Sequence, residues 1–180
     1  QGSTFAVGAA LGSRLNKFKN RIYLLQSDGE LQEGSSWEAI MSAGHYHLGN
    51  LTAIVDRNRI QLDGWTEETM ALEPIGKKFE AFNWHVQEVD GHDLNQVYDA
   101  ILKTHEIGPK ENKPCVIIAH TIKGKGVSFM EDQVKWHGVA PNPGSEKITP
   151  ANVSVSATQD SVIAPVSTAP SLSSFPVEPK

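Results

Sequence analysis

Two short polar stretches combine residue types that could hold a divalent cation beside an anionic ligand. In "LLQSDGELQEG", Asp28 follows an apolar run and precedes Gly29, whose missing side chain allows close approach to the backbone. In "DRNRIQLDG", Asn58 follows another apolar run. An Asp carboxylate, an Asn amide oxygen and a backbone carbonyl at Ile60 are hard oxygen ligands, which Mg²⁺ accepts together with phosphate oxygens and water. Taken alone, Ser-Asp-Gly is also typical of a simple strand-to-helix turn.

Strands and helices that alternate along the chain could bring these two stretches together. Runs rich in Val, Ile and Leu predict buried parallel strands over 21–27, 51–57, 85–91 and 114–121. Helices are predicted over about 3–16, 35–47, 73–82 and 94–106. This alternation favours an α/β fold, with a parallel sheet and helices on both faces. Ligands of such sheets bind at the carboxyl ends of the strands, where both stretches fall.

The composition narrows the possible classes of protein. The chain has 180 residues, 39% apolar and 21% charged, which suits one globular domain with a real core. A net charge of -5 with scattered Lys and Arg argues against a nucleic-acid surface. The single Cys115 excludes an internal disulfide, fits a reducing cytoplasm and is expected to be a buried small hydrophobe. Because no apolar run reaches the ~20 residues of a membrane span, we expect a cytoplasmic protein.

Both ends of the chain differ from its middle. We expect a domain over residues 1–144 and a linker or disordered tail over 145–180. Residues 151–180 hold seven Ser, two Thr and four Pro, without helical or strand periodicity. The chain also starts abruptly inside a predicted helix, so we expect the domain to be truncated at its amino terminus.

The motifs together resemble a family of cofactor-dependent enzymes. "SDGELQEG" followed by "DRN" resembles the thiamine-diphosphate fingerprint, a Gly-Asp-Gly turn followed at a similar distance by Asn. The likeness continues through "EAIMSAGHYHLGNLTAIVDRNRIQLDG", "EPIGKKFEAFNWHVQEVDGHD", "AHTIKGKGVSFME" and "WHGVAPN". These stretches are similar to the diphosphate-binding domain of transketolase, and most similar to the amino-terminal subunit of split, two-subunit transketolases. The resemblance runs from Gln1 to about Asn142.

Carried over residue by residue, the resemblance implies a site for thiamine diphosphate and a metal ion. Asp28 and Asn58 match the side-chain metal ligands, and the carbonyl of Ile60 completes the protein's ligands for Mg²⁺, or for Ca²⁺ or Mn²⁺. Gly29 and Glu30 match the turn whose backbone amides meet the diphosphate. The first Gly of the fingerprint is Ser27 here, which we expect to be tolerated if the backbone needs no positive φ. The departure puts cofactor affinity in question more than the fold.

The resemblance also implies residues near the substrate and the partner. Glu33 matches an acidic residue at the interface between paired active sites, although a Glu in a first helical turn can also simply favour the helix dipole. His137 in "KWHG" matches a His that contacts the diphosphate or lies beside the substrate channel, and the alternative is an ordinary surface His. Glu33 and His137 are therefore the candidate catalytic residues. Lys123 in "TIKGKG" could reach the diphosphate, whereas Lys125 is expected in solvent. Five other histidines are not expected to form a metal site: His45, His47, His85, His92 and His105.

The implied activity is that of a transketolase, which transfers a two-carbon ketol unit from a ketose phosphate to an aldose phosphate in the pentose phosphate pathway. The cofactor carries the hard chemistry, and the protein binds and orients it. Since the Glu that activates the cofactor's aminopyrimidine belongs to the other half in the family, we expect an inactive isolated chain, a pyrimidine-binding partner, and a dimer or dimer of heterodimers. Two alternatives remain open. One is another thiamine-diphosphate enzyme, such as 1-deoxyxylulose-5-phosphate synthase or a 2-oxoacid dehydrogenase E1 component. The other is a truncated, non-catalytic assembly domain.

Overall fold

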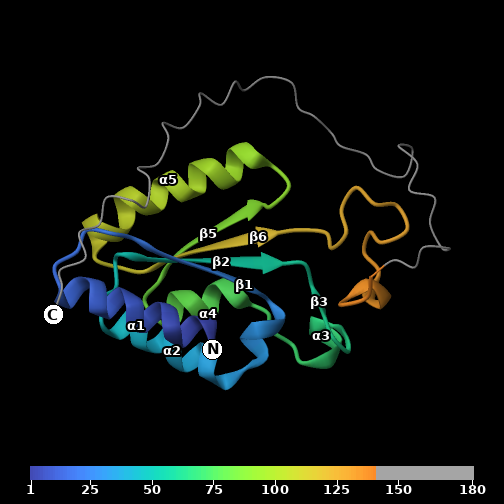
Figure 1. The fold of residues 1–180 in the computed structure, drawn as a ribbon, viewed down its shortest axis with the longest axis horizontal. Coiled ribbons are helices and arrows are strands. Elements are labelled where there is room, and N and C mark those ends of the chain that lie inside the picture. Colours follow the sequence, from blue (N-terminus) through green and yellow to red (C-terminus); the bar gives the residue numbers. More distant parts are fainter. Residues whose placement is uncertain (141–180) are drawn as a thin grey trace, which may run out of the picture.

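A parallel sheet organises the molecule. The computed structural model describes residues 1–140. The four-stranded sheet has the spatial order β1, β2, β6, β5, and every neighbouring pair is parallel. The bounds are β1 (Ile22–Ser27), β2 (Leu51–Arg57), β5 (His85–Asp90) and β6 (Cys115–His120). Figure 1 shows their carboxyl ends at one edge. The predicted α/β fold and its parallel sheet are confirmed.

Helices cover both faces of this sheet. One face carries α1 (Gly2–Leu15), α2 (Gly34–His45) and α4 (Ile75–Ala81), and the other carries α5 (Leu94–Glu111) (Figure 1). The carboxylate of Asp93 accepts hydrogen bonds from the backbone N–H groups of Asn95 and Gln96 and so caps α5. The prediction ended this helix too early, at about residue 106. It runs on through Pro109, in its last turn, and stops at Asn112, whose left-handed φ of 54° ends it.

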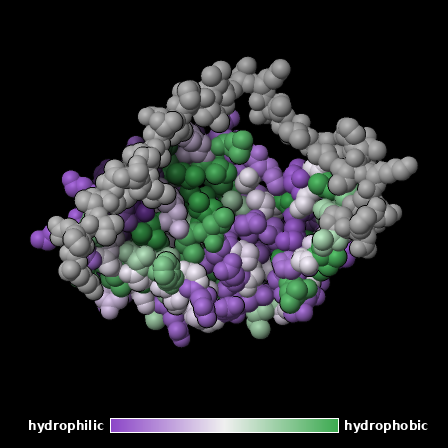
Figure 2. Space-filling model, viewed as in Figure 1, coloured by the Kyte–Doolittle hydropathy of each residue, from purple (hydrophilic) through white to green (hydrophobic). Residues whose placement is uncertain are grey.

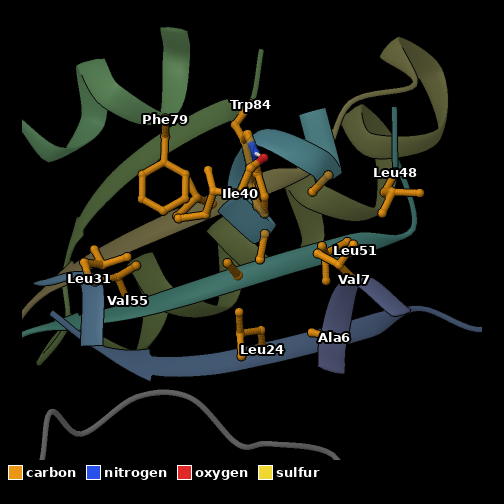
Figure 3. Close-up of a cluster of buried hydrophobic side chains, with 14 of the residues drawn as sticks. Ala6, Val7, Leu24, Leu31, Ile40, Leu48, Leu51, Val55, Phe79 and Trp84 are labelled. Atoms are coloured by element: carbon orange, nitrogen blue, oxygen red, sulfur yellow. Dashed lines mark hydrogen bonds between the residues drawn. The ribbon is translucent and has the colours of Figure 1, made fainter. Parts of the chain in front are cut away.

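The main core lies between the sheet and the three helices α1, α2 and α4 that cover one of its faces. Figure 3 shows Leu24 and Val55 from the strands facing Ile40, Phe79 and Trp84. On β2, every second side chain enters this core, as the alternation of a strand requires: Leu51, Ala53 and Val55. Burying one large apolar side chain contributes about 1.5–3 kcal/mol, so this layer supplies much of the stability.

The opposite face of the sheet is covered less completely. The outward side chains of the edge strand β1 are partly open, with Tyr23 46% and Leu25 74% exposed. Figure 2 shows hydrophobic atoms gathered in the middle of the visible surface. Within residues 1–140, no helix is both long and apolar enough to cross a membrane.

Short elements stand beyond the carboxyl ends of the strands, and none was predicted. A hairpin of β3 (Ile60–Gln61) and β4 (Gly64–Trp65) leads into α3 (Thr66–Thr69). Two 3₁₀ turns, η1 (Gly29–Gln32) and η2 (Val134–Trp136), complete the set. These elements were missed because pieces of two to four residues carry no hydrophobic period. The predicted boundary at residue 144 and the predicted tail over 145–180 lie outside the described residues.

Candidate cofactor and metal site

Asp28 is fully buried where β1 ends, with 0% of its surface exposed. The strand register sets its position, because Ser27 lies opposite Asp56 and the backbone N–H of Asp28 donates to the carbonyl of Asp56 at 3.1 Å. Its Oδ2 accepts hydrogen bonds from Nη1 of Arg57 at 2.6 Å and from the backbone N–H of Arg59 at 2.8 Å. Within residues 1–140, its Oδ1 has no hydrogen-bond partner. Because a buried unpaired acceptor is costly, this oxygen fits a ligand position for a cation.

Arg57 contacts the carboxylate of Asp28, and only 1% of its surface is exposed. Besides Asp28, its guanidinium donates to the hydroxyl of Thr66 at 2.7 Å and to the carboxylates of Glu67 at 2.8 Å and Glu73 at 2.9 Å. Burial acts to lower the pKa of Arg57, but the hydrogen bonds and charges of Asp28 and Glu73 outweigh it, and the pKa is raised above its usual value. The guanidinium therefore stays charged beside the proposed metal ligand.

Asn58, which directly follows β2, is held by a second hydrogen-bond network. Its Nδ2 donates to Asp56 at 2.9 Å, and its Oδ1 accepts from the backbone N–H of Ile60 at 3.0 Å. The other carboxylate oxygen of Asp56 accepts a hydrogen bond from the hydroxyl of Thr121. These contacts fix the amide with its oxygen toward the turn at Ile60, and an amide oxygen keeps a second lone pair for another contact. The donor set of Asp, Asn and a carbonyl therefore fits a hard cation.

The turn after β1 tolerates Ser27, as expected. Ser27 is the last residue of the strand and does not have a positive φ. Its backbone N–H and its hydroxyl donate to Glu30, at 2.9 and 3.3 Å. At Gly29 an added Cβ would lie 3.0 Å from Cβ of Gln61, so the hairpin approaches the backbone closely there. The turn needs a small residue at position 29 for steric reasons.

A crevice opens at the carboxyl ends of the strands. One cavity of about 670 Å³ brings together Glu30, Asn58 and Lys123, which were all predicted site residues. A second cavity of about 460 Å³ shares Asn58 and is lined by basic side chains, including Arg59, His92, His120 and Lys125. Lys125 is exposed, and its ammonium group pairs with Glu131 at 3.3 Å. In residues 1–140, no cluster of three or more His, Cys, Asp or Glu could hold a metal ion.

Five predicted site residues do not line either cavity: Asp28, Gly29, Glu33, Ile60 and His137. Glu33 is exposed at the start of α2 and lines neither cavity. His137 follows η2 and is half-buried, and it too lines neither cavity. The Nδ1 atom of His137 is buried and has no hydrogen-bond partner among the described residues. The catalytic roles of Glu33 and His137 stay predictions.

Arg57 and Asp56 were quoted within a motif but not predicted as site residues. A signal for Arg57 existed in the sequence. It occupies the next inward position of β2 after Leu51, Ala53 and Val55, and a charged residue at an inward position requires a buried partner. The carboxylate of Asp28 is that partner. Asp56 gave no comparable signal, since its carboxylate belongs to the opposite side of the strand.

The amino-acid sequence matches the model of a known protein family. The model for "Transketolase, thiamine diphosphate binding domain" matches residues 9–154. The chain belongs to this family of thiamine-diphosphate-binding domains. The resemblance inferred from the motifs is confirmed.

Among individual relatives, subunits of split transketolases match well. The chain is 42% identical over 140 residues to an apulose-4-phosphate transketolase subunit from Actinobacillus succinogenes, a match that covers 78% of this chain and 49% of the relative. It is 42% identical over 139 residues to "6-deoxy-6-sulfo-D-fructose transketolase subunit SqwG" of a Clostridium species, covering 77% and 50%. The chain thus spans about half the length of these curated relatives.

Solved transketolase structures share the fold. The structure of transketolase from Campylobacter jejuni superposes with a TM-score of 0.61 and 36% identity, over 74% of this chain and 21% of that chain. The transketolase from Leishmania mexicana gives a TM-score of 0.66 and 29% identity, over 74% and 21%. Both likenesses agree with the family match.

Proposed function

We propose that this chain is the diphosphate- and Mg²⁺-binding part of a transketolase. The observation that carries the proposal is Oδ1 of Asp28, which is fully buried at the carboxyl end of β1 and has no hydrogen-bond partner within residues 1–140. An oxygen acceptor with no donor in such a place suits a cation. The family match supports thiamine diphosphate as the cofactor whose charge that cation would balance.

The proposed roles follow from the chemistry of each group. Oδ1 of Asp28, Oδ1 of Asn58 and the carbonyl of Ile60 would hold the metal. The backbone amides of Gly29 and Glu30 would meet the diphosphate. Two cationic or donor side chains, Lys123 and His137, would complete the anion site. When bound, thiamine diphosphate would supply the nucleophilic carbon for the transfer of a two-carbon ketol unit, and the chain's own residues would bind and orient the cofactor.

The proposal includes a partner. Two relatives are named as subunits, and the chain covers only half of each. We infer that a pyrimidine-binding subunit or domain completes the active site, that Glu33 faces it, and that the assembly is a dimer of such pairs in the cytoplasm. The substrates would be a ketose phosphate and an aldose phosphate, as in the pentose phosphate pathway. The two relatives are named for different sugars, one a sugar phosphate and the other a sulfonated sugar, so the proposal names no particular ketose.

Calorimetric titration tests the cofactor site. Thiamine diphosphate is titrated into the protein with its pyrimidine-binding partner, with Mg²⁺ or with EDTA. We expect heat only with Mg²⁺. Asp28→Asn keeps the size of the side chain and an acceptor for Arg57 but removes the charge, and should raise the half-saturating Mg²⁺ concentration by about tenfold or more. The matched control is Asp63→Asn, which makes the same change at an exposed position between β3 and β4.

Three results would count against the proposal. Binding that is absent even with Mg²⁺ and the partner present would remove the cofactor assignment, and binding that does not depend on Mg²⁺ would remove the metal assignment. Binding by Asp28→Asn equal to that of the parent would remove the metal assignment. Product analysis with ketose phosphates against pyruvate would separate a transketolase from the other thiamine-diphosphate enzymes.

A further inference from the structure

The contacts of Asp28 divide its two carboxylate oxygens into different roles. Oδ2 is saturated by two donors, Nη1 of Arg57 and the backbone N–H of Arg59. Oδ1 is buried and has no donor in the part of the chain that the structure describes. A carboxylate with both oxygens free can bind a cation through both at once. In the described geometry only one oxygen of Asp28 is available.

Arg57 can hold this arrangement because it is itself fixed from every side. Its Nη1 also donates to Thr66 at 2.7 Å, its Nη2 to Glu67 and Glu73, and its Nε to Glu73 at 3.2 Å. The planar fork of a guanidinium serves all these acceptors together, which a Lys ammonium on a flexible stem does not. The position of Arg57 is therefore determined by the segment that includes α3.

The charges around Arg57 leave Asp28 able to bind a cation. Glu67 and Glu73, with side chains 38% and 50% exposed, face the far side of the guanidinium. Three negative and two positive side chains meet at this place, because the charge of Arg59 also acts on Glu73. The two glutamates offset the positive charges of Arg57 and Arg59, so the negative charge of Asp28 remains and the group still attracts a divalent cation.

We propose that Arg57 is a positioning residue for the metal site, which restricts Asp28 to binding a cation through a single oxygen and thereby favours Mg²⁺ over Ca²⁺. Mg²⁺ requires near-ideal octahedral geometry and is usually held by one or two carboxylates plus phosphate and water, whereas Ca²⁺ accepts six to eight oxygens and bidentate carboxylates. The inference rests on the proposed function, since it assumes that Asp28 is a metal ligand. It goes beyond that function by assigning metal discrimination to a residue that touches neither metal nor cofactor.

The test measures metal preference, which a merely structural role would not change. At saturating thiamine diphosphate, Mg²⁺ or Ca²⁺ is titrated into the protein with its partner, and cofactor binding is followed by calorimetry. Arg57→Lys should raise the half-saturating Mg²⁺ concentration by about tenfold or more. The Ca²⁺ value should change less, because Oδ2, then held only by the backbone N–H of Arg59, keeps a lone pair with which Asp28 can bind that ion through both oxygens. The ratio of the Ca²⁺ value to the Mg²⁺ value should therefore fall.

A matched control and a second variant keep the outcome decisive. Arg21→Lys makes the same change at the other end of the sheet, where Arg21 donates to Thr104 at 2.9 Å and to Thr52 at 3.2 Å, and it should leave the ratio unchanged. If Arg57→Lys does not fold, the variant Glu67→Gln tests the same inference. It weakens one contact of Arg57 from a side chain that is 38% exposed. The ratio of the Ca²⁺ value to the Mg²⁺ value should then fall by a smaller factor.

The failure of this inference can be told apart from the failure of the proposed function. If the parent protein binds thiamine diphosphate with neither metal, the proposed function is wrong, and this inference with it. If the parent binds with Mg²⁺ but the folded variants at positions 57 and 67 keep the parent's metal ratio, the proposed function stands and the role of Arg57 is wrong.

Discussion

Single side chains at the crevice are arranged around one buried ion pair. Asp28 and Arg57 lie 2.6 Å apart, and both are almost completely shielded from solvent. A buried pair contributes little by itself, because desolvating two charges offsets most of their attraction. Removing one partner is different, since it leaves the other charge buried without compensation. The main effect of the pair is therefore to fix the positions of the Asp28 and Arg57 side chains at the site.

This has a consequence for Asp28→Ala. We expect the variant to lose about 3 kcal/mol of unfolding free energy, near the lower end for a broken buried pair because Glu67 and Glu73 still contact Arg57. Urea denaturation followed by tryptophan fluorescence measures the loss. Asp28→Asn is the control and should lose much less. A stability of Asp28→Ala equal to that of the parent would mean that the ion pair does not form in solution.

Glu73 should make stability depend on acid pH. Burial acts to raise its pKa, but the backbone N–H of Ile75 and the guanidinium of Arg57 outweigh it, and the pKa lies below its usual 4.5. A carboxyl with a lowered folded pKa stabilises the fold above the unfolded value, and this stability is lost as the pH falls through the folded pKa. Glu73→Gln should therefore be less stable than the parent near pH 7, and the difference should shrink below pH 4.5. A difference that is constant from pH 7 to pH 3 in thermal unfolding would contradict this.

Cys115 should be chemically inert in the folded protein. It is fully buried, and burial raises its thiol pKa to about 11. The thiolate is the reactive species, so its population near pH 8 is very small. We expect no reaction with a thiol-specific disulfide reagent at pH 8 until the protein unfolds in urea. Rapid labelling of the native protein would show that β6 is open to solvent.

The sequence indicated where the crevice lies. Glu30, Asn58 and Lys123 were expected at the strand ends and line the crevice there, while their binding roles stay predictions. The role of Arg57 was missed because its partners come from outside the sheet: Glu67 lies in a segment without predicted structure, and Glu73 is the first residue of a predicted helix. Their approach to Arg57 depends on the hairpin and α3, whose geometry no local pattern encodes.

At the scale of elements, long periodic segments were predictable and short ones were not. The four strands and four helices were placed correctly because apolar residues recur with the period of each element. The end of α5 was misplaced because Gly108 and Pro109 normally stop a helix. In the structure, Gly108 instead packs against the loop before β2, where an added Cβ would lie 2.4 Å from the carbonyl oxygen of Gly49.

This close packing predicts the effect of a glycine substitution. A Cβ added at Gly49 would lie 2.3 Å from the carbonyl oxygen of Gly108, so Gly49→Ala forces the backbone of α5 to move. We expect a loss of about 1–3 kcal/mol in unfolding free energy, the usual cost of overpacking. Gly8→Ala is the matched control, because position 8 lies in α1 with nothing within 4 Å of an added Cβ. It should stabilise the protein by roughly 0.5–1 kcal/mol through helix propensity. Equal effects of the two changes in chemical denaturation would contradict the packing of α5.

At the scale of the whole molecule, the chain spans about half of its curated relatives. Under the proposed function, the chain alone should show no ketol transfer, and activity should appear when the pyrimidine-binding partner is added. A coupled assay of aldose phosphate formation measures this. An inactive mixture that still binds thiamine diphosphate would support the assembly alternative, whereas activity of the chain alone would remove the need for a partner.

The order of the strands has a consequence for synthesis of the chain. β6 is the last strand of the described residues, yet it lies in the middle of the sheet, between β2 and β5. Until residues 115–120 have been made, β5 has no neighbouring strand and β2 has one open edge. Domains generally form as the chain emerges, and unpaired strand edges favour aggregation in that interval. A chain that ends before Cys115 would therefore consist of the β1–β2 pair and an unpaired β5, with the crevice residues of β2 and the loop after β6 never brought together.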